Sequence, residues 1–345
     1  MRIGSIVGMA ALVGAAVAGR PEPATAQGSL NLYCSVQVEW CQAAAAGFQK
    51  QAGIKVNMTQ KGSGETLAQI RAEAQNPKGD VWFGGTGDPH LIVAQEGLSE
   101  EYESPRIKEL HAWAQSQWQA AKKRTVGIYA GALGFGYNTE LLAKKKLAEP
   151  RCWADLLKPA YKGEVQMANP NSSGTAYTMI ATLSQLMGDE GAFDYMKKLH
   201  ANVNAYTRSG TGPIKAVARG ETGVSISFVH DAVTEANAGF PAAYATPCEG
   251  TGYEIGSMSI VKGARNLEAA KKFYDWALTP DAQRLGAEAG KQMQTPSHTK
   301  APLPPGAPDL AKIKLIKYDF VKYGSPTERK RLLDRWNADI GSLAR

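Results

Sequence analysis

The stretch LNLYCSVQVEWCQAAAAGFQKQAGIKVNMTQKGSGETLAQIRAEAQNPKGDVWF, residues 30–83, decides the fold class of this chain. Its short apolar runs predict strands at 30–34, 54–58 and 79–83. Between them, residues 38–51 and the segment after the turn 61–64 have the apolar spacing of helices. Strands that alternate with helices indicate a parallel sheet. Ligands of such sheets bind beyond the carboxyl ends of the strands, where this chain has Ser35, Ser63 and Thr86.

The rest of the chain repeats this alternation, so a second α/β unit is predicted. Further strands are expected at 133–137, 164–167, 224–229 and 255–261, and further helices at 176–187 and 266–278. The last of these helices can return to the first unit, which would give two lobes, a hinge and a cleft. We expect lobe 1 to comprise 27–130 with 256–293, and lobe 2 to comprise 131–255 with 294–345.

The first 26 residues have the pattern of a signal peptide. Arg2 precedes an apolar, small-residue run at 3–18, and Ala24-Thr25-Ala26 provides a small-x-small cleavage site. The run is short for a membrane span. We therefore expect cleavage near Ala26 and export to the periplasm, with an uncleaved anchor as the alternative.

Four cysteines in an exported chain predict two disulfides, for which three pairings are possible. We favour Cys34 with Cys41, which can close a strand-to-helix turn, and Cys152 with Cys248. A zinc site is disfavoured because the cysteines lack both C-x-x-C spacing and a nearby histidine cluster. Neither a metal nor a cofactor is expected.

The composition excludes several classes of function. The net charge of +7 is spread along the chain, and the basic runs at 122–124 and 144–146 lack interleaved aromatic residues, so nucleic acid is not an expected partner. The glycine-rich segment 84–87 lacks the lysine of a Walker motif, which argues against nucleotide hydrolysis. The mild positive balance suits an anionic small-molecule ligand.

The order of these segments resembles the periplasmic binding proteins grouped with the ferric-iron-binding receptors of ABC importers. The segments that carry the resemblance are 32–35, 62–64, 168–175 and 266–283. It implies a type II periplasmic binding protein, with two α/β lobes of mixed and parallel sheets joined by a hinge and a ligand cleft between them. Such a receptor is a monomer that delivers its ligand to an ABC transporter permease in the inner membrane. The iron receptors hold their metal with paired tyrosines where this chain has His230 and Asp231, which argues against ferric iron.

The hexose-phosphate-binding branch of the same family is a closer match. The chain resembles it in CSVQ at 34–37, FVH at 228–230 and CEGTGY at 248–253. The resemblance implies that His230, Asp231 and Glu249 bind sugar hydroxyls. A carboxylate can accept two hydrogen bonds from neighbouring hydroxyls, which fixes the orientation of the sugar.

The phosphate needs hydrogen-bond donors, and loops at predicted helix starts provide them. The candidates are Ser172, Ser173, Gly174 and Thr175 in one loop, Ser63 and Gly64 on the other lobe, and Ser35, Thr86 and Thr211 in further loops. Helix N-termini favour anions by roughly 0.3–1 kcal/mol at exposed sites. The alternative for these serines is simple helix capping.

These patterns predict a receptor that captures a phosphorylated sugar. A phosphonate or another organophosphate is the next alternative, followed by a ferric or other metal ion. An enzyme is the alternative from a different class of protein, since His230, Asp231 and Glu249 could provide the general acid and the general base for a reaction on a sugar. The chain lacks a G-x-S-x-G elbow and a metal motif, so we do not expect an enzyme.

Overall fold

The computed structural model of this protein describes residues 1, 4 and 28–343. The predicted cleavage site near Ala26 and nearly all of the predicted signal peptide lie outside the described residues. Among the residues that are described, there is no helix with the length and apolar character needed to cross a membrane.

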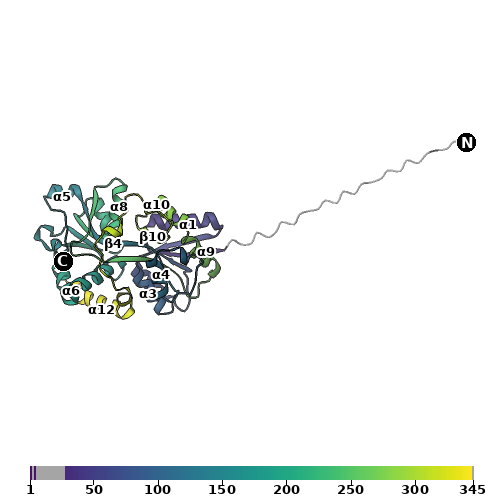
Figure 1. The fold of residues 1–345 in the computed structure, drawn as a ribbon, viewed down its shortest axis with the longest axis horizontal. Coiled ribbons are helices and arrows are strands. Elements are labelled where there is room, and N and C mark those ends of the chain that lie inside the picture. The colour runs from purple at the N-terminus through teal and green to yellow at the C-terminus, as the bar shows by residue number, and fades with distance from the viewer. Residues whose placement is uncertain (2–3, 5–27, 344–345) are drawn as a thin grey trace.

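Residues 28–343 form two α/β lobes that lie side by side (Figure 1). The strands are β1 (Ser29–Cys34), β2 (Lys55–Gln60), β3 (Val81–Phe83), β4 (Val126–Asn138), β5 (Val165–Ala168), β6 (Val203–Thr207), β7 (Val224–Phe228), β8 (Ala242–Ala245), β9 (Tyr253–Ile260) and β10 (Thr295–Pro296). The α-helices are α1 (Val38–Ala52), α2 (Ser63–Ala72), α3 (Gly87–Gln95), α4 (Ala112–Ala120), α5 (Thr139–Lys145), α6 (Gly174–His200), α7 (Gly212–Ala218), α8 (Val229–Asn237), α9 (Leu267–Ala277), α10 (Pro280–Gly290), α11 (Phe320–Tyr323) and α12 (Pro326–Trp336). Short 3-10 helices lie at Ile107–Glu109, Trp153–Leu157, Pro159–Tyr161 and Leu310–Lys312, and a π-helical turn lies at Asn337–Gly341.

Two antiparallel strands, β4 and β9, connect the two lobes. The strands are ordered β2-β1-β3-β9-β4-β7-β5-β6, with β8 and β10 also paired to β4. The first half of β4 pairs antiparallel with β9 as far as Ala132, and its second half pairs with β7 from Leu133 onward. All its residues are buried. The predicted strand at 133–137 is thus only the second half of a longer strand that crosses between the lobes.

Each lobe has its own hydrophobic core. In the first lobe, α1 and α9 pack on the β1–β3 sheet, and Trp40, Phe48 and Phe273 lie in its core. In the second lobe, Trp153 and Phe193 lie in a core that also includes residues of α12. Separate cores joined by crossing strands allow the lobes to move as units.

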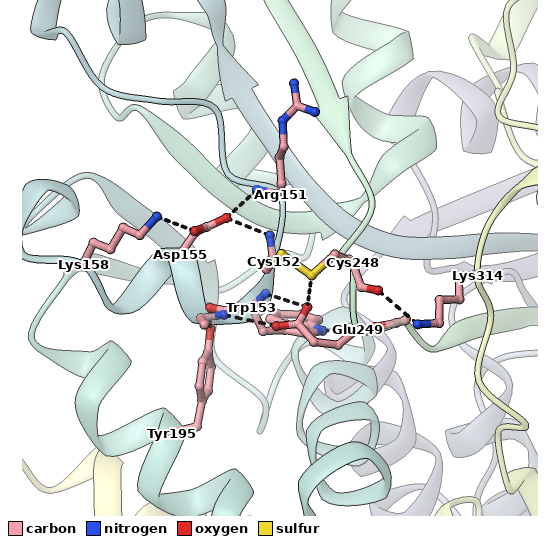
Figure 2. The surroundings of a disulfide bond; sticks show 11 residues. Arg151, Cys152, Trp153, Asp155, Lys158, Tyr195, Cys248, Glu249 and Lys314 are labelled. Atoms are coloured by element: carbon pink, nitrogen blue, oxygen red, sulfur yellow. Dashed lines mark hydrogen bonds and ion pairs between the residues drawn. A yellow bond between two sulfur atoms is a disulfide. The ribbon is translucent and has the colours of Figure 1, made fainter.

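Two disulfides fix loops in the two lobes. Cys34 at the end of β1 is bonded to Cys41 in α1, and Cys152 is bonded to Cys248 in the second lobe (Figure 2). The structure therefore contains the pairing that we favoured among the three possibilities.

The long helix α6 extends beyond the helix predicted at 176–187. Gly188 has φ 71° within it, so the helix kinks there and then continues to His200. A positive φ is readily adopted by glycine, which explains why the helical pattern ends at this point in the sequence.

Candidate functional site

A cavity lies between the lobes, and polar residues from both lobes form most of its wall. It is lined by Ser35, Val36, Gln37, Gln60, Lys61, Gly62, Ser63, Gly85, Thr86, Tyr129, Ser173, Gly174, Thr175, Ser209, Gly210, Thr211, Phe228, His230, Asp231, Glu254 and Gln294. Its chemistry differs from one end to the other: hydroxyls and helix starts form one part, and acidic and amide side chains form another.

The hydroxyl-rich part is built from the N-termini of helices. Residues at the starts of α2, α3 and α6 line the cavity, namely Ser63, Thr86 and Ser173. The first N–H groups of a helix lack partners within the helix, and the helix dipole places partial positive charge there. Helix starts that converge from both lobes are therefore suited to bind an anion.

Two hydroxyl groups in this part are available to a ligand. Thr86 Oγ1 and Ser173 Oγ are buried and have no hydrogen-bond partner within residues 28–343. Buried polar atoms nearly always have a partner, so a pair of unpartnered hydroxyls in a cavity indicates donors for a bound group. A side chain at Gly174 would overlap Thr86, so glycine is needed there for the two lobes to meet.

The acidic part of the cavity is a buried cluster around His230. This residue lies in the first turn of α8, and β7 already ends at Phe228, one residue earlier than predicted. Its Nε2 atom lies 3.6 Å from Asp231 Oδ1 and 3.9 Å from Glu254 Oε1. Its Nδ1 atom has no hydrogen-bond partner among the described residues. The cluster therefore keeps free hydrogen-bonding capacity.

Burial controls the protonation of this cluster. It raises the pKa of Asp231 to about 7. Burial also raises the pKa of Glu254 well above its ordinary value, and the negative charge of Asp231 adds to that increase. Burial lowers the pKa of His230 to about 3. A neutral imidazole beside carboxyl groups that can hold protons both donates and accepts hydrogen bonds, which suits the hydroxyls of a sugar.

Neighbouring amides and a phenol orient the two carboxyl groups. Gln37 Nε2 donates a 2.6 Å hydrogen bond to Asp231 Oδ1, and Gln294 Nε2 donates to Gln37 Oε1 at 3.2 Å. The Tyr129 hydroxyl donates to Glu254 Oε2 at 3.4 Å. Since Gln37 belongs to the first lobe and Asp231 to the second, the first of these bonds also joins the lobes.

Further contacts join the lobes at the rim of the cavity. The N–H group of Gly64 donates to the carbonyl oxygen of Ser172 at 3.1 Å. Beside this bond, Glu65 forms an ion pair with Arg208. Away from the rim, Asp88 of α3 and Arg329 of α12 form a buried ion pair at 2.6 Å. The structure is therefore a closed form of the cleft.

The structure brings together most of the residues predicted from the sequence. Those that line the cavity are Ser35, Ser63, Thr86, Ser173, Gly174, Thr175, Thr211, His230 and Asp231. Gly64 and Ser172 do not line it; they form the rim contact between the lobes.

The assignment of Glu249 needs correction. Its carboxylate accepts hydrogen bonds from the backbone N–H groups of Trp153, at 3.0 Å, and Ala154, at 3.4 Å. It lies beside the Cys152–Cys248 disulfide rather than in the cavity (Figure 2). Glu249 therefore caps a short helix, and Glu254 is the glutamate that lies beside His230.

The sequence-based prediction missed several cavity residues, among them Gln37, Lys61, Tyr129, Glu254 and Gln294. Glu254 carried a usable signal, because it is the one charged residue in a strand that is otherwise apolar or small and almost entirely buried. Gln294 carried none, since it reaches the cavity only through the fold of the segment between α10 and β10.

Residues 89–323 match the family of bacterial extracellular solute-binding proteins, and the chain belongs to that family. It is a periplasmic binding protein of an ABC transporter, with the type II fold, and the family binds solutes without catalysing a reaction. The family and the fold that the sequence predicted are thereby confirmed.

Particular relatives are similar over nearly the full length of the chain. An uncharacterised protein of Haemophilus influenzae is 45% identical over 328 residues, which cover 95% of this chain and 94% of that protein. The periplasmic binding protein AfuA from Actinobacillus pleuropneumoniae, solved with fructose-6-phosphate bound, is 46% identical with a TM-score of 0.89, over 92% of this chain and 100% of AfuA. The periplasmic binding protein P5PA is 41% identical with a TM-score of 0.87, over 91% of this chain and 99% of that one.

Proposed function

We propose that this protein captures a hexose phosphate in its cleft for import. The observation that carries the proposal is the division of one closed cavity into a part built from helix N-termini and hydroxyls and a part built from His230, Asp231 and Glu254. A sugar phosphate has the same division, with an anion at one end and hydroxyls at the other. The similarity to AfuA, solved with fructose-6-phosphate bound, supports this ligand class.

In this proposal, the phosphate lies among the starts of α2, α3 and α6. The unpartnered hydroxyls of Thr86 and Ser173 donate to its oxygens, together with the first backbone N–H groups of the helices. Lys61 is the only lysine or arginine that lines the cavity among the described residues. Charge on the phosphate is therefore met mainly by neutral donors and helix dipoles.

The sugar ring lies at the acidic part. Asp231 and Glu254 accept hydrogen bonds from adjacent hydroxyls, and burial, which raises the pKa of both groups, favours protonated carboxyl groups that can donate as well. A free phosphate ion lacks the contacts to the acidic part of the cavity, and a free sugar lacks the contacts to the helix starts. We therefore expect the complete sugar phosphate to bind much more tightly than either part alone.

The working cycle follows from the two lobes. We propose that lobe 1 comprises 27–130 with 256–293 and that lobe 2 comprises 131–255 with 294–345. The two lobes open about the crossing strands, bind the anionic ligand and close. The closed monomer then docks on a permease of the inner membrane, after export that removes the signal peptide near Ala26. Neither nucleic acid nor a cofactor takes part in this cycle.

Calorimetric titration of the purified protein tests the proposal. We expect fructose 6-phosphate or glucose 6-phosphate to bind, and fructose, glucose and inorganic phosphate to bind at least tenfold more weakly. Glu254→Gln should reduce the affinity for the sugar phosphate, whereas Glu249→Gln, the matched control outside the cavity, should not. A protein that binds only a phosphonate or ferric citrate would keep its class but lose this ligand assignment.

A further inference from the structure

A second cavity adjoins the first one at its acidic part, where the proposed function has the sugar. It lies between α1 of the first lobe and α7 and α8 of the second. Gln37, Thr211 and Asp231 line both cavities, so these three residues form the wall between them. The volume of the second cavity is about 240 Å³, against about 50 Å³ for the first. Since one water needs about 10–15 Å³ of such space, the second cavity can take a much larger group.

The charged groups around this cavity are balanced and loosely paired. Lys215 lies 3.9 Å from Glu39, which is longer than a hydrogen bond, and Glu235 and Lys291 complete the ring. Their four charged groups make no side-chain hydrogen bonds within the described part of the chain. Arg219 is occupied by Glu221, through hydrogen bonds of 2.5 and 3.0 Å. Two carboxylates and two ammonium groups do not favour a second anion.

These groups do match a neutral polyhydroxylated unit. Carboxylates accept hydrogen bonds from hydroxyls and ammonium groups donate to them, so a sugar can bridge both kinds of group. Phe240 lies at the same cavity with 42% of its surface exposed, and an aromatic ring of this kind can cover the apolar face of a sugar ring. Acidic groups, ammonium groups and one aromatic ring thus surround the space.

The shared wall determines which end of the ligand points into this cavity. Asp231 belongs to the acidic part of the first cavity, where the proposed function has the sugar hydroxyls. The hydrogen bond from Gln37 to Asp231 closes this wall in the structure, so a substituent that extends from the sugar, away from the phosphate, enters the second cavity only when these two side chains separate. We propose that this cavity binds the second sugar unit of a phosphorylated disaccharide, an inference that rests on the proposed function.

Titration of the whole protein with matched ligands tests this subsite. Trehalose 6-phosphate and glucose 6-phosphate share the phosphorylated hexose and differ by one glucose unit. We expect both to bind the wild-type protein. Phe240→Ala and Glu235→Gln should each weaken trehalose 6-phosphate at least fivefold and change glucose 6-phosphate less than twofold. Tyr244→Ala, which alters an aromatic residue of similar exposure outside both cavities, is the control.

The possible outcomes separate the two proposals. Binding of glucose 6-phosphate without binding of trehalose 6-phosphate or sucrose 6-phosphate would refute the subsite and leave the proposed function intact. Equal losses for both ligands in Phe240→Ala would also refute it, because they indicate a general effect on the cleft. Failure of every sugar phosphate to bind would refute the proposed function, and the subsite with it.

Discussion

Gly64 offers a direct test of whether closure of the lobes controls ligand binding. It lies in the first turn of α2, buried against the second lobe. A Cβ atom there would lie 3.1 Å from the carbonyl carbons of both Asn171 and Ser172, and closer still to the carbonyl oxygen of Asn171. Ordinary contacts of this kind begin at 3.4 Å. Gly64→Ala should therefore hold the lobes apart without adding any group to the cavity.

The size of the effect follows from the hydrogen bond and the ion pair that join the lobes at the rim. The hydrogen bond from Gly64 to Ser172 is 3.1 Å long, so a separation of about 0.5 Å exceeds the usual limit. Such a bond contributes about 0.5–1.5 kcal/mol, and the neighbouring Glu65–Arg208 pair about 0–1 kcal/mol. Together the two contacts contribute about 0.5–2.5 kcal/mol, and their loss weakens ligand binding about 2- to 70-fold. Alanine is also a better helix former by about 0.5–1 kcal/mol, so the free protein should not lose stability.

Titration with the proposed hexose phosphate measures the affinity, and thermal unfolding of the ligand-free protein measures the stability. Gly28→Ala is the control, because its new methyl group meets no atom within 4 Å. Closure of the lobes would not control binding if Gly64→Ala kept its stability and bound ligand within twofold of the wild-type affinity. A lower unfolding midpoint of the free protein would also count against this explanation, since the substitution would then disturb the lobe itself.

Three further predictions concern stability. Arg329→Met leaves the carboxylate of Asp88 buried without its cation, so it should lower the free energy of unfolding by about 3–5 kcal/mol in urea titrations. The double variant Arg329→Met/Asp88→Asn should regain part of this lost stability. Replacing Cys152 and Cys248 by serine should lower the free energy of unfolding by about 4–5 kcal/mol, and replacing Cys34 and Cys41 should lower it by about 2–3 kcal/mol. The first loss is larger because the paired cysteines are 96 residues apart in the sequence, against 7 for the second pair. Equal losses would contradict the argument that a disulfide restricts the entropy of the unfolded chain. Burial raises the pKa of Asp231 from 3.8 to about 7. Between these two pH values the folded protein keeps a proton that the unfolded chain releases. The Asp231 carboxyl group therefore lowers the stability of the fold as the pH rises from about 4 to about 7. Over that range the unfolding midpoint of ligand-free Asp231→Asn should fall less than that of the wild type, and parallel curves would count against the assignment.

The parts of the site that the sequence predicted depend on local signals. Ser63 begins a helix, and Thr86 and Ser173 directly precede one, in each case at a glycine-containing or polar turn that is recognisable within a few residues. The alternation of strands and helices in 30–83 likewise determines the arrangement of the first lobe. The two-lobed fold could be predicted for the same reason.

The parts that were missed depend on distant pairing. Glu254 reaches His230 because β9 pairs antiparallel with β4, which aligns Glu254 with Gly131, beneath the imidazole ring. Glu249 precedes it by only five residues, yet the Cys152–Cys248 disulfide holds it beside Trp153. Strand register and disulfide geometry are not encoded in neighbouring residues, so a resemblance between short motifs could not distinguish the two glutamates.

The crossing of β4 and β9 has a consequence for how receptors of this kind diversify. The core of the first lobe combines residues near both 30 and 273, and the core of the second combines residues near both 135 and 336. Because neither lobe is a continuous piece of chain, a recombination event at any single breakpoint cannot transfer an intact lobe to another receptor. A single exchange of chain between two receptors would instead combine parts of both lobes, and its product would have to rebuild both hydrophobic cores at once.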